Sequence, residues 1–120
     1  MRKFIAIAVT VIGAGAIALW SARAADPGSE MTVKGEVLDM ACYLDHGAHG
    51  EKHAQCAQGC ISSGLPVGIK ADDGKVYLLI GEHKPLNAEL APLAAKTITV
   101  KGKLVSRDGI NMIENAEIVK

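Results

Sequence analysis

Short segments in which apolar and polar residues alternate account for much of the chain after residue 30. In the first of them Met31, Val33 and Val37 fall on one face, which is the period-two pattern of a half-buried β-strand. We predict five such strands, over residues 31–39, 65–69, 76–80, 97–105 and 110–119. Asp72-Asp73-Gly74 supplies turn chemistry between the second and third strands, so these two are expected to form a hairpin.

One segment has the periodicity of a helix. Between the third and fourth predicted strands, apolar side chains recur at the spacing of a helix face: Leu86, Leu90, Leu93 and Ala94. Asn87 is a candidate N-cap. Pro92 limits this helix to one or two turns, because proline is tolerated only in the first turn.

The first and fourth strands each contain a glycine near the centre, Gly35 and Gly102, in the similar stretches Thr-Val-Lys-Gly-Glu-Val and Thr-Val-Lys-Gly-Lys-Leu. A glycine inside a strand marks a bulge or strong coiling. The order strand, insert, strand, strand, short helix, strand, strand resembles the OB-fold. This resemblance implies an all-β fold, a five-stranded OB-fold-like barrel in which strands one and four are neighbours. Residues 41–64, which are rich in cysteine and histidine, would then form a helical insert between strands one and two. An open antiparallel sheet or an SH3-like barrel fits the pattern less well.

The N-terminal residues have the features of a secretory signal. Arg2 and Lys3 precede an apolar stretch that ends at Trp20, and Ala22-Arg23-Ala24 matches the small-x-small pattern that signal peptidase cleaves. A retained anchor is the alternative, but the stretch is marginal for a membrane span. We therefore expect residues 1–24 to be a signal peptide and residues 25–120 a single periplasmic or secreted domain that is not attached to a membrane.

Charge and aromatic content bear on the partners of this domain. The chain has 13 basic and 13 acidic residues, and loss of Arg2, Lys3 and Arg23 leaves ten basic against thirteen acidic, a net charge of −3 with neutral histidines. Nucleic acid binding needs a basic surface, which is missing from this composition. Tyr43 and Tyr77 are the aromatic residues left after cleavage, so the domain also lacks a stacking platform for bases. We expect no nucleic acid partner.

Cysteine and histidine are concentrated in one segment, residues 42–60. It holds all three cysteines of the chain and three of its four histidines: Cys42, His46, His49, His53, Cys56 and Cys60. A helix is predicted over residues 51–63, ended by the stop signal of Gly64 and Pro66. Residues three, four and seven apart share a helix face, which predicts one stripe of four side chains: His49, His53, Cys56 and Cys60. The glycine-rich stretch before it lets Cys42 fold back to the same stripe.

The same segment resembles a group of small exported bacterial proteins of uncharacterised function. Four motifs carry this resemblance: Gly35-Glu36-Val37, Cys42-Tyr43-Leu44, His53-Ala54-Gln55-Cys56-Ala57-Gln58-Gly59-Cys60 and Gly64-Leu65-Pro66-Val67-Gly68. The resemblance implies no particular activity. In size and layout the chain is also similar to periplasmic OB-fold proteins studied as stress-tolerance factors, although those lack a cysteine segment.

The ligand types point to a metal site. Zinc takes four tetrahedral nitrogen or sulfur ligands, and copper(I) is also drawn to thiolates. We predict a Cys3His site for zinc or copper, formed by Cys42, His53, Cys56 and Cys60, with His49 and His46 as alternate ligands. Haem attachment requires Cys-x-x-Cys-His, and a thioredoxin-like centre requires Cys-x-x-Cys in a βαβ unit. Neither pattern is present.

We expect neighbouring residues to have supporting roles. Asp39 and Asp45 flank the cluster and are candidates to orient a ligand imidazole. Tyr43 is expected to cover the site by packing. His83, after the third strand, is expected to be a surface residue.

A disulfide is the alternative to a metal. In an oxidising periplasm Cys42 can pair with Cys56 or Cys60, which would stabilise the domain by about 3 kcal/mol through chain entropy and leave one thiol over. Cys56 and Cys60, four apart on a helix, would bridge only with strain.

Three functions follow from these alternatives. The first is an exported binding domain that holds one metal ion, for stability or for metal handling. The second is a metal-free, disulfide-stapled interaction or stress-tolerance module that binds an envelope protein or peptide. The third is a thiol-redox partner that uses Cys56 and Cys60. An enzyme is not favoured, because the chain has no nucleophile elbow, phosphate loop or paired carboxylates, and a Cys3His metal has no open position for substrate.

Overall fold

The structure is a computed structural model that describes residues 26–120, so the predicted signal peptide lies outside the described residues. The strands are β1 (Glu30–Asp39), β2 (Val67–Ala71), β3 (Val76–Leu79), β4 (Thr97–Arg107) and β5 (Ile110–Ile118). The helices are α1 (Met40–His46), α2 (Ala54–Ser62) and α3 (Asn87–Leu90), with 3-10 turns η1 (Glu51–His53) and η2 (Ala91–Leu93). Over residues 26–120, none of the helices has the length and apolar character needed to span a membrane.

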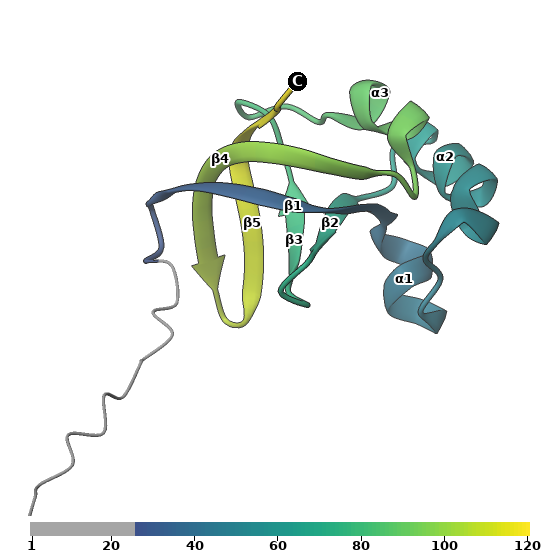
Figure 1. Cartoon of the computed structure of the whole chain (residues 1–120), viewed down its shortest axis with the longest axis horizontal. Coiled ribbons are helices and arrows are strands. Elements are labelled where there is room, and N and C mark those ends of the chain that lie inside the picture. Colours follow the sequence, from purple (N-terminus) through teal and green to yellow (C-terminus); the bar gives the residue numbers. More distant parts are fainter. Residues whose placement is uncertain (1–25) are drawn as a thin grey trace, which may run out of the picture.

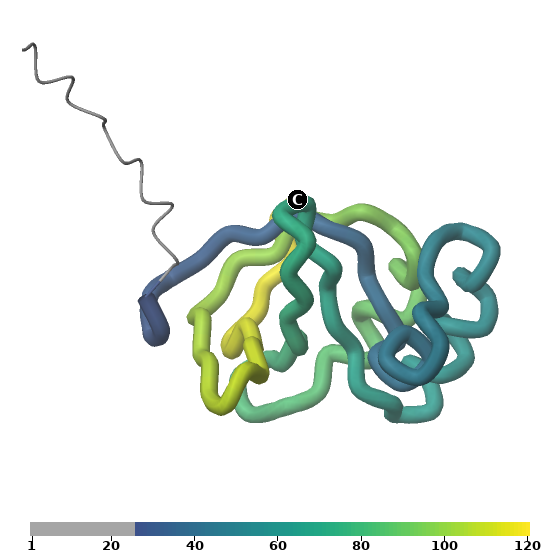
Figure 2. Tube along the Cα trace, turned by 90° about the horizontal axis from the view of Figure 1, so that it is seen from below, coloured from purple at the N-terminus to yellow at the C-terminus, as the bar shows by residue number. Residues whose placement is uncertain are grey.

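The five strands close into a barrel in the order β1-β2-β3-β5-β4, and β4 pairs back with β1 (Figure 1). Every neighbouring pair is antiparallel except β3 and β5, which run parallel. The predicted OB-fold-like barrel is confirmed, including the adjacency of the first and fourth strands. The Cys/His insert leaves the barrel after β1 and returns at β2, so α1 and α2 lie together at one end of it (Figures 1 and 2).

Two glycines permit the bends that close the barrel. Gly35 lies where β1 changes its neighbour, since the strand pairs with β4 before it and with β2 after it. A Cβ atom there would collide with the backbone of Lys70. Gly102 lies in a bulge of β4, where a Cβ atom would be 2.6 Å from Cγ2 of Ile113. The repeated glycine therefore marks two places where strands approach too closely for a side chain.

Alternate side chains of the strands form the core, as the period-two pattern predicts. The strand residues of this core are Val33, Val37, Val67, Ile69, Ala71, Tyr77, Leu79, Val100, Leu104, Ile113 and Ala116. The segment formed by α3 and η2 adds Leu86, Leu90, Ala91 and Ala94, and α2 adds Ile61. Removing these apolar surfaces from water is the main stabilisation of the fold.

Several local predictions are corrected by the structure. The second strand begins at Val67, and Leu65 is 38% exposed. Asn87 does not cap α3; its side-chain amide instead donates to the carbonyls of Ile61 and Leu65 at 2.8 and 2.7 Å. These carbonyls lie at the end of α2 and just beyond it, where helix carbonyls need external partners.

The insert also differs from the single predicted helix. Residues 40–46 form the unpredicted helix α1, which begins at an N-cap aspartate and ends at Gly47, a glycine with φ of 71°. The predicted helix over residues 51–63 consists of the 3-10 turn η1 followed by α2. His49 precedes both elements, so the predicted helix face shared by His49, Cys56 and Cys60 is wrong for His49.

Candidate metal centre

Cys42 is placed by the junction of β1 and α1. The carboxylate of Asp39 accepts hydrogen bonds from the backbone N–H groups of Ala41 and Cys42, at 3.1 and 3.3 Å. This N-cap starts the helix immediately after the strand, and Cys42 falls in its first turn. The N–H of Met40 donates to the carbonyl of Pro66 at 3.0 Å, which ties the start of α1 to the end of the insert. Cys42 is thereby fixed relative to the barrel.

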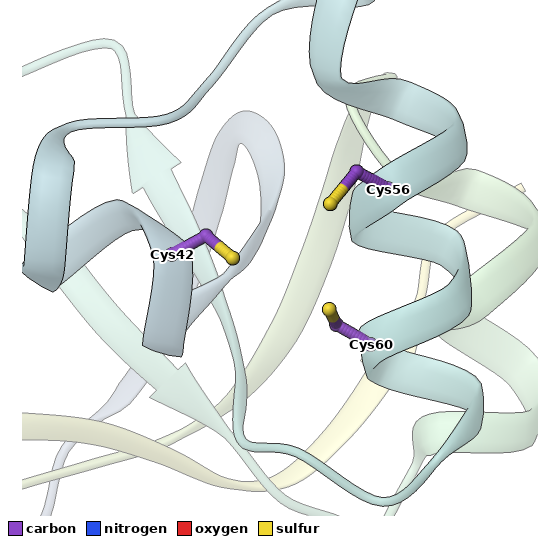
Figure 3. A group of neighbouring side chains, drawn as sticks. All are labelled: Cys42, Cys56 and Cys60. Atoms are coloured by element: carbon purple, nitrogen blue, oxygen red, sulfur yellow. The ribbon is translucent and has the colours of Figure 1, made fainter.

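Cys56 and Cys60 are placed by α2. Ile61 of this helix is fully buried in the core, which anchors α2 against the barrel and against the segment formed by α3 and η2. The two cysteines lie one helical turn apart, so their side chains project from the same face of α2. That face is turned toward α1 (Figure 3).

The three sulfur atoms converge. The Sγ atoms of Cys42, Cys56 and Cys60 all lie within 4.8 Å of one another, and the side chains point toward a common centre (Figure 3). Zn–S bonds of about 2.3 Å in a tetrahedron separate two sulfurs by about 3.8 Å, so the sulfurs need approach by no more than about 1 Å to bind an ion. These three cysteines could hold a metal ion. The convergence required of the predicted site is confirmed for its three cysteines.

The surroundings of Cys42 and Cys60 favour the protonated form of these two thiols in the absence of a metal. The hydrogen bond that the Cys42 thiol donates to Asp39, together with loss of solvent and the negative charge of that carboxylate, raises the pKa of Cys42 to about 12. Partial burial raises the pKa of Cys60 as well, and the negative charge of Asp39 adds to the effect. A cation bound among the sulfurs would reverse this balance, because it stabilises the thiolates.

None of the histidines in the described part of the chain belongs to the group of converging ligand atoms. The predicted fourth ligand, His53, is exposed, and so are the alternates His46 and His49. All three instead line a small hollow of about 30 Å³ that also borders Cys42 and Cys56. His83 lies outside this hollow and is exposed, as predicted for a surface residue.

The flanking residues have separate roles. Asp39 contacts Cys42, rather than an imidazole as predicted. Asp45 pairs with Nδ1 of its neighbour His46 at 3.0 Å on the exposed surface, where both side chains are more than half accessible. Tyr43 packs edge-on against His49, with ring centroids 6.3 Å apart and an interplanar angle of 71°. Tyr43 therefore supports the rim of the hollow.

Sequence reasoning missed Glu36. Its side chain, on β1, accepts a hydrogen bond from the N–H of Gly50, and its Oε2 atom lies 3.7 Å from Nδ1 of His49. Nothing in the spacing along the chain links a strand residue to a loop thirteen positions later. Only the folding of the insert back over the end of β1 brings them together.

The chain matches none of the protein-family models, none of the curated proteins and none of the solved structures with which it was compared. The candidate metal centre therefore rests on the geometry and the chemistry of the three cysteines.

Proposed function

We propose that this protein binds one zinc or copper ion through the thiolates of Cys42, Cys56 and Cys60, with a histidine of the insert as the fourth ligand. The observation that carries the proposal is the convergence of three sulfurs from two helices, each helix fixed independently to the barrel. Three thiolates and an imidazole are an established set for zinc, and thiolates also select copper(I).

The bound ion would cross-link α1 to α2 and so hold the insert against the end of the barrel. A metal with three thiolates and one imidazole has no open position for a substrate, so the proposed role is binding rather than catalysis. Binding in this sense covers both a structural staple and metal handling. We propose that it takes place in an exported protein, where metal coordination would also protect the thiols from oxidation.

Metal and thiol stoichiometry test this function. Protein isolated from the exported fraction, or refolded under reducing conditions with zinc, is expected to contain one metal ion per chain and no disulfide. Cys42→Ser, Cys56→Ser and Cys60→Ser should each abolish tight binding. His83→Asn is the matched control, because His83 is exposed and has φ of 51°, a conformation that asparagine tolerates.

The opposite result would favour the alternative. All three cysteines are free in the structure, but the closeness of their sulfurs also allows two of them to be oxidised together. One disulfide and one thiol per chain, with no metal even after reduction and zinc addition, would contradict the metal proposal. It would support the disulfide-stapled interaction module instead, and reversible cycling under mild reductant would support a thiol-redox partner.

A further inference from the structure

The hollow beside the sulfurs limits the choice of residue for the fourth ligand of the proposed metal centre. The hollow is bordered by Cys42 and Cys56 and by the three histidines of the insert. Its volume of about 30 Å³ is enough for a water molecule or an ion. An imidazole that completes the site must therefore reach the sulfurs across or beside this space.

One of the three imidazoles lies beside a carboxylate supplied by the barrel. Nδ1 of His49 lies 3.7 Å from Oε2 of Glu36, and the other oxygen of Glu36 accepts the N–H of Gly50. The Glu36 side chain is only 20% exposed, against 49% for His49. Imidazoles that bind metals almost always donate their second ring N–H to a carboxylate, a carbonyl or water, which fixes the tautomer and the ring orientation.

The other two histidines lack such an arrangement. His46 pairs with Asp45, but the two are sequence neighbours and are 59% and 83% exposed, so solvent weakens the pair. His53 forms no ion pair with a carboxylate within residues 26–120. The pairing of His49 with Glu36 is thus the one that the fold itself imposes on these three.

We infer that His49 is the fourth ligand of the metal centre and that Glu36 is the residue that positions its imidazole; this inference rests on the proposed function. If Nδ1–H donates to Glu36, which requires the 3.7 Å separation to shorten by less than about 1 Å, the lone pair of Nε2 is left to bind the ion. His49 lies between Gly47 and Gly50, which have φ of 71° and 81°. Two such glycines let the short segment adjust when the imidazole closes on the ion.

Cobalt(II) and zinc binding to the reduced full-length mature chain test the inference. The visible bands of cobalt(II) report its ligand set, and zinc competition then gives the affinity. His49→Ala should change the cobalt bands and weaken zinc binding by at least about tenfold, while Glu36→Gln should weaken binding by about 10–100-fold with the bands retained. His46→Ala and His53→Ala are the matched controls, and both should behave as the unchanged protein does.

A second measurement needs no substitution. Nitrogen-15 NMR of the unchanged protein should show zinc shifting the Nε2 resonance of His49 and leaving those of His46 and His53 in place. The inference is overturned if His53→Ala causes the loss instead, if the shifted resonance belongs to another histidine, or if all three alanine variants bind equally well. In those cases the Cys→Ser variants would still lose the metal, and the proposed binding through the three thiolates would stand. Unchanged protein that binds no metal overturns both.

Discussion

The buried carboxylate of Asp39 makes two kinds of contact, one with the backbone of α1 and one with the thiol of Cys42. It caps α1 by accepting two backbone N–H groups, and it also accepts the thiol hydrogen of Cys42. The first contact holds Cys42 in position. The second raises the pKa of the thiol to about 12, which keeps Cys42 protonated in the metal-free protein. Asp39 therefore both positions Cys42 and determines how strongly protons would compete with a metal ion for its sulfur.

This leads to a prediction about thiol reactivity in the metal-free protein. Only the thiolate reacts with an alkylating reagent, so a raised pKa slows the reaction at any pH below that value. At pH 8 iodoacetamide should modify the exposed Cys56 before Cys42, with the order determined by mass spectrometry of peptides. The rate at Cys42 should then rise about tenfold for each pH unit up to its pKa.

Asp39→Asn isolates the cause of this slow reaction. Asparagine removes the charge and still caps α1 through its one side-chain oxygen, so it should lower the pKa of Cys42 and speed its alkylation at pH 8 while the rate at Cys56 stays unchanged. Asp39→Ala should also lose about 1 kcal/mol of stability with the cap. An unchanged Cys42 rate in Asp39→Asn would show that solvent exclusion, not the carboxylate, controls this thiol.

Single residues could be predicted from the sequence only where their chemistry is distinctive. Cys42, Cys56 and Cys60 were identified because cysteine near histidine signals metal or disulfide chemistry. Glu36 was missed because a glutamate in a strand has many possible partners. His49 was expected on one helix face with Cys56 and Cys60, but the turn before α2 is a 3-10 turn that begins after His49.

At the scale of elements, the strands were predictable because a half-buried sheet imposes a period of two on the sequence. The helix α1 was not, because its seven residues are too few to show a period. Its only sequence signals are the capping aspartate before it and Gly47 after it. The partner of Asn87 also could not be predicted, because its amide bonds to residues 26 and 22 positions earlier.

The position of α2 is expected to depend on Asn87. Asn87→Ala removes two hydrogen bonds and leaves the carbonyls of Ile61 and Leu65 without these donors, so it should reduce the free energy of unfolding by about 1–3 kcal/mol. Asn111→Ala is the control, because its bond to Ser106 is exposed and its loss should change stability by less than about 0.5 kcal/mol. Urea unfolding of both variants measures the difference. Equal stability of the two would mean that α2 is held by Ile61 alone.

At the scale of the whole molecule, the barrel and the insert are stabilised by different means. The barrel has its own apolar core, to which the insert contributes Ile61 as its one fully buried side chain. The remainder of the insert is short helices and loops with mostly exposed residues. A metal ion bound by the three cysteines would supply the cross-link that such a segment lacks.

Metal removal should therefore loosen one part of the molecule. After chelation under reducing conditions, hydrogen exchange should become faster over residues 40–63 and remain unchanged in β2, β4 and β5, because their protection comes from the barrel. Peptide-resolved mass spectrometry with and without zinc measures this, and Cys56→Ser should match the chelated protein. Uniformly faster exchange across the barrel would show that the metal stabilises the entire fold.

Closure of the barrel also affects how copies of this protein meet. The edge strands of an open sheet have unpaired N–H and C=O groups with which a strand of another chain can pair. Within residues 26–120 the five strands form a closed ring and none of them is an edge strand. The ring is completed by the parallel seam of β3 and β5, which pairs Leu78 with Met112 and Leu79 with Ile113 and continues through two backbone hydrogen bonds of Ile80. If the protein ever polymerises or exchanges strands, that short seam is where the ring should part.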